Sequence, residues 1–166
     1  MGKGRSEGGV VDLYSIVKVI HIISATIVFG TGMGIAYFML LGQRSRDFVE
    51  RRFAARATVL ADYTFTLPAV IVQPLSGAWL VWKAGFDWTD FWLVGTYALY
   101  ILAGLCWVPV VFIQIAMKRM LDRHAVDGAF DEAAFNRLFR RWFALGWPAF
   151  GGLVVIFGLM VMKPSW

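Results

Sequence analysis

Residues 91–117 read FWLVGTYALYILAGLCWVPVVFIQIAM and contain no charged side chain. A membrane-spanning helix needs about 20 apolar residues in a row, because each helical residue advances by only about 1.5 Å through the hydrocarbon core. The stretch exceeds that length without a break. It therefore predicts a helix that crosses a bilayer.

Three more stretches of this kind occur in the chain. The four predicted spans are residues 10–41, 59–82, 91–117 and 142–162. Strands are excluded for these segments, because an open sheet edge in lipid would leave backbone groups without hydrogen-bond partners. We therefore predict an all-α fold, a four-helix transmembrane bundle that forms a single domain over residues 1–166.

The composition supports this fold class and excludes others. Of the 166 residues, 59% are hydrophobic and 16% are charged, whereas soluble domains carry about 25% charged residues. A chain this short cannot bury so much apolar surface in its own core. A soluble enzyme and a disordered chain are therefore excluded, and the single cysteine, Cys106, excludes an intrachain disulfide scaffold.

Most of the 16 basic residues lie in two segments, one before residue 59 and one after residue 117. In a four-span protein these segments share one side of the membrane, and basic loops are retained in the cytoplasm. The sequence thus predicts a multi-pass protein of the bacterial inner membrane with both termini in the periplasm. The basic charge is explained by topology, so we expect the lipid bilayer as partner and no nucleic acid.

The two basic segments also contain aromatic residues at helical spacing. Phe130, Phe135 and Phe139 alternate with arginines, and Asp127 or Asp131 is placed to cap the helix that carries them. This pattern is typical of interfacial helices whose arginines reach anionic headgroups. We expect Arg-rich interfacial helices on the cytoplasmic side, with partner docking as the alternative role.

Polar residues inside the spans are the candidates for function, because they are costly there. One face of the first span carries Tyr14, Lys18, His21, Ala25, Val28 and Gly32. A neutral imidazole such as that of His21 is a common ligand of metals and haem iron, and Gly32 would let a flat macrocycle approach the backbone. The alternative is a histidine that bonds a neighbouring helix, with Lys18 reaching outward to the headgroups.

The histidine count limits a haem site. The second histidine, His124, is expected in the opposite aqueous loop, which excludes two histidine ligands from one chain. A haem on His21 would be five-coordinate, or would take Met160, Met162 or a residue of a second subunit as its other ligand. Copper on His and Met stays an alternative, although the chain has no Met-x-x-Met cluster.

The remaining polar groups in the spans have simpler explanations. Thr66, Gln73 and Gln114 are expected to bond between helices or to backbone carbonyls that prolines release. The prolines concerned are Pro68, Pro74 and Pro109. Asp62 lies near the inner edge of its span, where a carboxylate would face water or pair with Arg56.

Several motifs resemble one family along nearly the whole chain, from about Leu13 to Pro164. They are Tyr14-x3-Lys18-x2-His21, Gln73-Pro74-Leu75-Ser76-Gly77, Trp107-Val108-Pro109 with Gln114, Gly146-Trp147-Pro148, and Leu159-Met160-Val161-Met162-Lys163-Pro164. The family consists of predicted bacterial integral membrane proteins of unknown function. It is distantly similar to CopD copper-resistance proteins and HemJ-type protoporphyrinogen oxidases.

The resemblance implies a haem-b ancestry. HemJ-type proteins bind haem b through a histidine early in their first helix, and His21 matches that position. They also carry a functional lysine after a tryptophan at the start of the third helix, whereas this chain has Leu93 after Trp92. The resemblance therefore implies haem binding more strongly than protoporphyrinogen oxidation, and whether the chain is an enzyme stays open.

Two hypotheses follow. In the first, the chain is a small haem-b protein with a redox or electron-transfer role, in which His21 ligates the iron and Lys18 and Tyr14 lie near a haem propionate. In the second, it is a non-catalytic membrane subunit or assembly factor that docks a partner through its basic cytoplasmic loops. A homodimer or a larger membrane complex is compatible with either.

Overall fold

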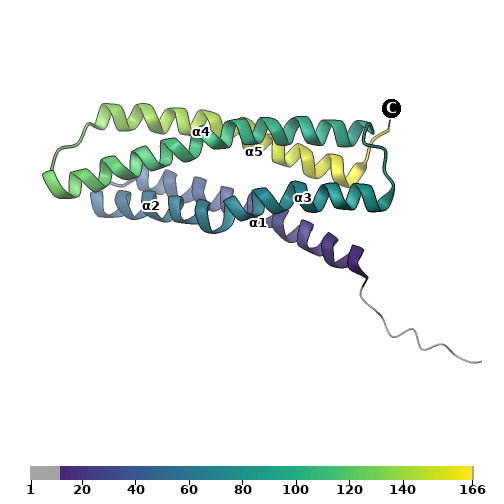
Figure 1. The fold of residues 1–166 in the computed structure, drawn as a ribbon. Coiled ribbons are helices and arrows are strands. Elements are labelled where there is room, and N and C mark those ends of the chain that lie inside the picture. Colours follow the sequence, from purple (N-terminus) through teal and green to yellow (C-terminus); the bar gives the residue numbers. More distant parts are fainter. Residues whose placement is uncertain (1–11, 166) are drawn as a thin grey trace, which may run out of the picture.

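The computed structural model describes residues 12–165 (Figure 1). The elements in chain order are α1 (Leu13–Arg44), α2 (Phe48–Ala61), η1 (Asp62–Thr66), α3 (Leu67–Ala84), α4 (Phe91–Asp127) and α5 (Glu132–Met162). The first two residues of the predicted span 10–41 lie outside the described residues. Lys3 and Arg5, two of the 16 basic residues, also lie outside them.

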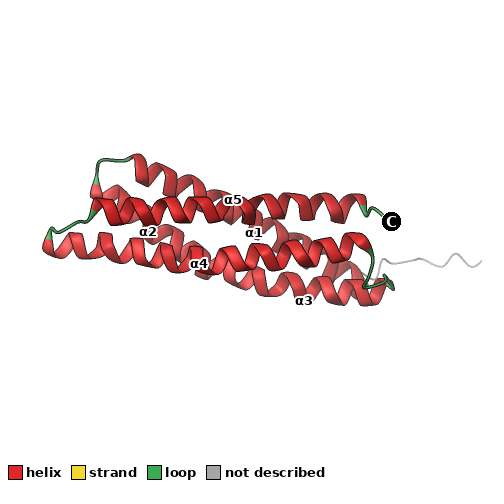
Figure 2. Cartoon of the chain, turned by 90° about the horizontal axis from the view of Figure 1, so that it is seen from above, coloured by secondary structure: helices red, strands yellow, loops and turns green. Residues whose placement is uncertain are grey.

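Four helices are long and apolar enough to cross a membrane, as the sequence predicts. They are Leu13–Arg44, Phe48–Ala84, Phe91–Asp127 and Glu132–Met162. The second comprises α2, η1 and α3, which follow one another without interruption. Every regular element of the described chain is helical (Figure 2). The prediction of an all-α protein with four apolar helices is confirmed.

Aspartates begin three of these helices. Asp12, Asp47 and Asp131 each accept a hydrogen bond from a backbone amide in the first turn, at 2.7 to 2.8 Å. An N-cap of this kind satisfies an amide that has no partner inside the helix. Of the two candidates for the cap of α5, the structure selects Asp131.

The helices pack as two pairs. α5 lies along α4, and α1 lies against α2 and α3 (Figure 1). The pairs are joined mainly by α2 and α4, whereas α1 and α5 touch only locally. The bundle is therefore closed at the end that contains α2 and is more open farther along α1 and α5.

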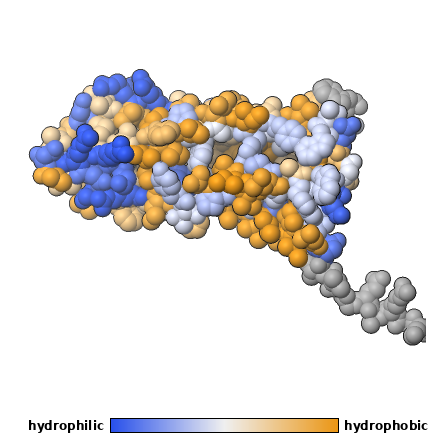
Figure 3. Space-filling model, in the orientation of Figure 1, coloured by the Kyte–Doolittle hydropathy of each residue, from blue (hydrophilic) through white to orange (hydrophobic). Residues whose placement is uncertain are grey.

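Hydrophilic side chains gather at the closed end, where α1 connects to α2 and α4 connects to α5 (Figure 3). We call this the Arg-rich end. The middle of the bundle exposes large apolar side chains, such as Leu105 at 69% of its surface. Water would not stabilise such a surface, whereas lipid would.

The Arg-rich segments differ from the predicted interfacial helices. They continue the axes of the spanning helices beyond the apolar zone and form part of the bundle (Figure 1). Phe135 and Trp142 are accordingly buried, in one cluster with Met117 and Leu121 of α4. The short connection between α4 and α5 brings the aromatic face of α5 onto α4, so this face is covered by protein instead of lipid.

Arg51 holds this end of the bundle together. Its guanidinium donates two hydrogen bonds of 3.0 Å to the carboxylate of Glu132 and lies about 5 Å from the ring centroids of three phenylalanines, at 5.2, 5.1 and 4.7 Å. The rings belong to Phe48, Phe130 and Phe135. The paired oxygens and the ring faces compensate for the burial of the charge, and the interaction connects α2 to α5.

A second charge cluster connects α2 to α4. The carboxylate of Asp122 accepts hydrogen bonds from Arg52 at 2.7 Å, from Arg56 at 2.8 Å and from Lys118 at 3.1 Å. Partial burial alone would raise the pKa of the Asp122 carboxyl, but the three cationic donors outweigh it and hold that pKa well below its usual range. The folded bundle therefore favours the ionised carboxylate.

We predict that Asp122→Asn lowers the thermal midpoint of the detergent-solubilised protein at pH 7, because three cations lose their shared anion at a cost of about 1–2 kcal/mol. A carboxyl with a depressed pKa stabilises the fold above its unfolded pKa of about 4, and the contribution is lost as pH falls below that value. The difference between wild type and variant should stay constant from pH 7 to about 5 and shrink below about 4. A difference independent of pH would contradict this account.

Candidate ligand-binding cavity

His21 of α1 is bonded to α3 through both ring nitrogens. Nδ1 lies 2.9 Å from the hydroxyl oxygen of Ser76, and Nε2 lies 3.3 Å from the amide nitrogen of Gln73. Ser24, one turn along α1, donates to the side-chain oxygen of Gln73. The prediction that Gln73 bonds between helices is confirmed, and the contact network matches the alternative in which His21 bonds a neighbouring helix.

The partners of Ser76 indicate which ring nitrogen carries the proton. The Ser76 hydroxyl donates to the carbonyl of Val72 at 2.7 Å, so its oxygen is left to accept. His21 then donates from Nδ1–H, and its Nε2 carries the lone pair that faces the Gln73 amide. The ring also contacts Gly77 closely, since a Cβ at that position would lie 3.0 Å from Cε1 of His21.

The other residues predicted beside His21 are spread along α1. Lys18 is exposed, and the ring of Tyr14 lies 6.4 Å from that of Trp79. Gly32 lies three turns farther along the helix, next to the ring of Phe150 on α5. The structure therefore does not bring His21 and Gly32 into one site.

The two methionines proposed as second haem ligands lie in the last turn of α5. Met160 packs against a cluster formed by Val81, Trp92 and Leu93, and Met162 is exposed. His124 stacks on Phe48 at the Arg-rich end, with ring centroids 3.9 Å apart. Its position far along α4 from the His21 level agrees with the separation that the sequence predicts.

A cavity of about 330 Å³ lies inside the bundle, between α1 and α5. Its walls are mostly apolar and come from α1, η1, α3, α4 and α5. Gly32, Gly104 and Gly146 line it on three different helices, and each leaves unfilled the space that a larger side chain would occupy. Met33, Phe143 and Trp147 line the cavity and are exposed, so its mouth opens laterally between α1 and α5.

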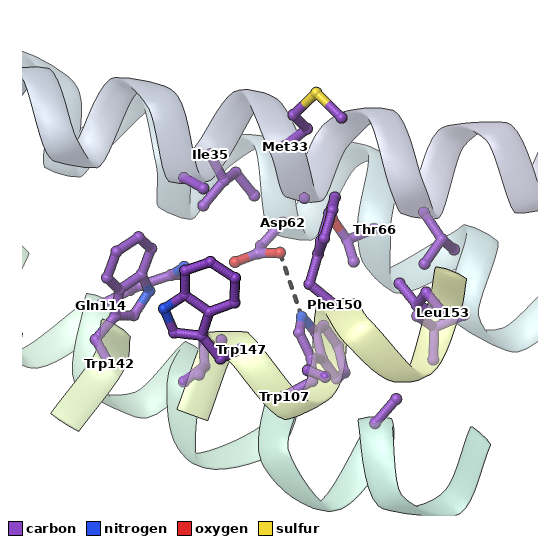
Figure 4. A pocket seen from close by; sticks show the side chains of 18 of the residues that line it. Met33, Ile35, Asp62, Thr66, Trp107, Gln114, Trp142, Trp147, Phe150 and Leu153 are labelled. Atoms are coloured by element: carbon purple, nitrogen blue, oxygen red, sulfur yellow. Dashed lines mark hydrogen bonds between the residues drawn. The ribbon is translucent and has the colours of Figure 1, made fainter. Parts of the chain in front are cut away.

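A π-helical turn places a carboxylate in this cavity. In η1 the amide of Leu67 donates to the carbonyl of Asp62, five residues earlier. The turn ends directly before Pro68, which has no amide to donate and whose ring crowds a regular helical turn. Such π-helical turns are frequent at functional sites. Here the turn directs Asp62 and Thr66 inward (Figure 4).

Asp62 is only 3% exposed. One carboxylate oxygen accepts a long hydrogen bond of 3.4 Å from the indole N–H of Trp107 (Figure 4), and the other has no hydrogen-bond partner in the described structure. The expectation that Asp62 faces water or pairs with Arg56 is therefore wrong. Arg56 instead pairs with Asp122, which lies nearer the Arg-rich end.

Two more polar side chains at the cavity, those of Thr66 and Gln114, interact with the Asp62 carboxyl. For Gln114 this is an interaction between helices, as the sequence predicts. Thr66 and Gln114 are 4% and 1% exposed, yet the Thr66 hydroxyl and the Gln114 side-chain oxygen make no hydrogen bond within residues 12–165. The carbonyl of Val70, which Pro74 deprives of its helical donor, is instead satisfied by Tyr100 at 2.6 Å.

The sequence contains a signal for the distorted turn, but it does not predict that Asp62 faces the cavity. Asp62 and Thr66 are four residues apart and Pro68 follows, which marks a distorted turn. Nothing in the sequence indicated that the distortion would turn Asp62 away from water. The sequence predicts that Gln114 bonds within the bundle, but it does not identify the partner, because the partner depends on how α4 faces η1.

No three His, Cys, Asp or Glu side chains come together as a metal site in the described part of the chain. What the fold and the cavity define is a small helical integral membrane protein with an internal cavity that opens laterally. The chain belongs to the family described as predicted integral membrane protein (DUF2269), whose profile matches residues 15–164. Comparisons with curated proteins and with solved structures give no significant match.

Proposed function

We propose that this protein binds a lipid-soluble molecule within the bilayer, in the cavity between α1 and α5. The observation that supports the proposal is the combination of apolar walls with buried side-chain oxygens that lack a partner, Oδ2 of Asp62 and Oε1 of Gln114. Ligand sites typically have this composition and enclose roughly 300–1,000 Å³. At about 330 Å³ the cavity suits a small ring system or part of a longer amphiphile.

The access route suits a ligand that arrives from lipid. The exposed cavity-lining residues belong to α1 and α5 in the apolar middle of the bundle. A ligand that partitions into the bilayer would reach this mouth by lateral diffusion. Polar solutes would have to cross the hydrocarbon first, which disfavours them.

Filling the cavity provides the test. A Cβ at Gly146 would meet no atom within 4 Å, so we predict that Gly146→Leu folds normally and occupies space that the ligand needs. The measurement is quenching of tryptophan fluorescence by para-bromophenethyl alcohol in lipid nanodiscs, since Trp107, Trp142 and Trp147 line the cavity. Saturable quenching in the wild type should be lost in the variant.

Gly151→Leu is the matched control. Gly151 lies on the same helix, also has no atom within 4 Å of a Cβ, and is exposed outside the cavity. It should quench as the wild type does. Equal saturable quenching in Gly146→Leu and Gly151→Leu would contradict binding in the cavity, because the probe would then be partitioning into lipid.

Haem b on His21, with a redox role, is the second candidate. One observation favours it: donation from Nδ1–H to Ser76 leaves the lone pair on Nε2, which is the tautomer of a histidine ligand with an outer hydrogen bond. We also base this candidate on the resemblance of the first-span motif, Tyr14-x3-Lys18-x2-His21, to HemJ-type proteins. The space beside the ring is occupied, however, by Gln73 and Gly77, so Gln73 would have to rotate away.

If His21 ligates haem, the purified protein should show a Soret band when haem is supplied during expression. His21→Ala should abolish the band, whereas His124→Ala, at the Arg-rich end, should not. Lys18→Ala should retain haem less firmly, because a propionate would lose a partner worth about 1 kcal/mol or less. A colourless wild type would leave His21 as a bond between α1 and α3, with copper as the remaining ligand to test.

The alternative function, docking of a partner protein, would use the exposed arginines at the Arg-rich end. Part of the basic charge is used within the bundle by the pairs with Glu132 and Asp122. The arginines that stay exposed at the Arg-rich end are Arg44, Arg46, Arg119, Arg123, Arg137, Arg140 and Arg141. They would contact lipid headgroups or an acidic partner, including in a homodimer or larger membrane complex.

We further propose that the protein lies in the bacterial inner membrane with the Arg-rich end in the cytoplasm. The support is that both basic segments lie at the same end of the bundle (Figure 3). A reporter that is active only in the periplasm should then give signal after the last residue and none when inserted at Gly128. The reverse result would invert the orientation of the whole bundle.

A further inference from the structure

We infer that the ligand of the cavity is a lipophilic amine in its protonated form, with Asp62 as counter-ion. The inference rests on the proposed binding in the cavity and specifies the chemical class of the ligand. It follows from the hydrogen-bonding capacity, the charge and the aromatic residues of the walls.

The hydrogen-bonding capacity of the cavity calls for a donor. When Asp62 is ionised, as a counter-ion must be, its Oδ2 can only accept, as can Gln114 Oε1, and Thr66 Oγ1 can accept as well as donate. All three atoms are buried and have no hydrogen-bond partner within 3.5 Å in the described structure, and the side chains of Thr66 and Gln114 lie close to the Asp62 carboxyl. An ammonium group presents up to three N–H donors from one atom, whereas a hydroxyl presents one. The amine therefore matches the three neighbouring oxygens more completely.

The charge of the cavity points to a cation. Asp62 forms no ion pair within residues 12–165. Arg56 precedes η1 on α2 and Lys118 follows Gln114 by one turn on α4, but both bind Asp122. An acidic side chain inside the membrane is rare and usually pairs with a charge or lines a transport path. A ligand cation would supply the partner that the chain does not.

The remaining walls suit an organic cation. Six aromatic side chains line the cavity: Tyr100, Trp107, Trp142, Phe143, Trp147 and Phe150. Ring faces attract ammonium groups, and tryptophan does so most strongly. The same rings would pack against the apolar part of the ligand. A metal ion is disfavoured by the single carboxylate, and an anion by the three acceptor oxygens.

One unpaired donor also lies at the cavity. The indole N–H of Trp142 is buried without a partner, on α5 rather than on η1 or α4. It is available to a hydroxyl or ether oxygen elsewhere on the ligand. The amine end and the apolar end of such a molecule would then have different contacts.

A matched series of probes tests the inference. The probes are para-bromophenethylamine, which is protonated at neutral pH, the alcohol of the same shape, and para-bromophenylacetate as the anion. Binding is measured by tryptophan quenching in nanodiscs of uncharged lipid at pH 7. We expect the amine to bind the wild type roughly ten- to a hundredfold more tightly than the alcohol, as hydrogen bonds to a charged group imply.

Asp62→Asn keeps the shape of the side chain and removes its charge. In this variant the amine should bind only as tightly as the alcohol, while alcohol binding stays within about twofold of wild type. Gln114→Leu, which removes one acceptor and keeps Asp62, should lose part of the preference. If Asp62→Asn does not fold, the comparison of amine and alcohol on the wild type and on Gln114→Leu decides the question.

The outcomes distinguish a failure of the inferred amine ligand from a failure of ligand binding in the cavity. If the alcohol and the amine bind the wild type equally, and Gly146→Leu abolishes both, the cavity binds ligands but the inference of an amine is overturned. Tighter binding of the acetate also overturns it. If no probe shows saturable binding that depends on Gly146, the proposed function itself fails.

Discussion

The structure depends on ion pairs that connect the helices at the Arg-rich end of the bundle and that are not repeated between α1 and α5. At the Arg-rich end, Arg51 joins α2 to α5 through Glu132, and Asp122 joins α2 to α4. These ion pairs hold the two helix pairs together where water is nearby. Farther along, α1 and α5 have no comparable connection and touch only locally. Because lipid tails are as apolar as the side chains they contact, no hydrophobic force closes the gap between two apolar helices in a bilayer.

The gap persists because of the residues that face it. Gly32, Gly104 and Gly146 have no side chain to fill it, and a Cβ at Gly104 or Gly146 would meet no atom within 4 Å. Close approach of glycines usually lets membrane helices pack backbone to backbone. Here the glycines line a cavity instead, and Asp62 points into it near Trp107 (Figure 4). The polar groups at this position would be costly in a merely structural role, which is why we assign them to binding.

The sequence was sufficient for the features that depend on local composition. Apolar runs such as residues 91–117 predicted the four long helices, and the aspartate before α5 was a correct candidate for its cap. That Gln73 bonds between helices followed from the cost of leaving an amide unpaired, although its partners Ser24 and His21 did not. The predictions that were wrong concern features that depend on the rotation of one helix relative to another. The sequence could not tell that Phe135 faces α4 instead of lipid, or that Asp62 faces the cavity instead of Arg56.

The π-helical turn also fixes the helical phase of everything after it. A turn with bonds from residue i to i+5 accommodates one residue more than an α-helical turn, and each residue in an α-helix rotates the chain by about 100°. The extra residue between α2 and α3 therefore sets which face of α3 meets α1. Without it, Arg51 and Asp122 could keep their contacts, but Gln73 and Ser76 would rotate away from His21. The one extra residue in η1 thus allows the ion pairs of α2 at the Arg-rich end and the contacts of α3 with His21 to form in the same bundle.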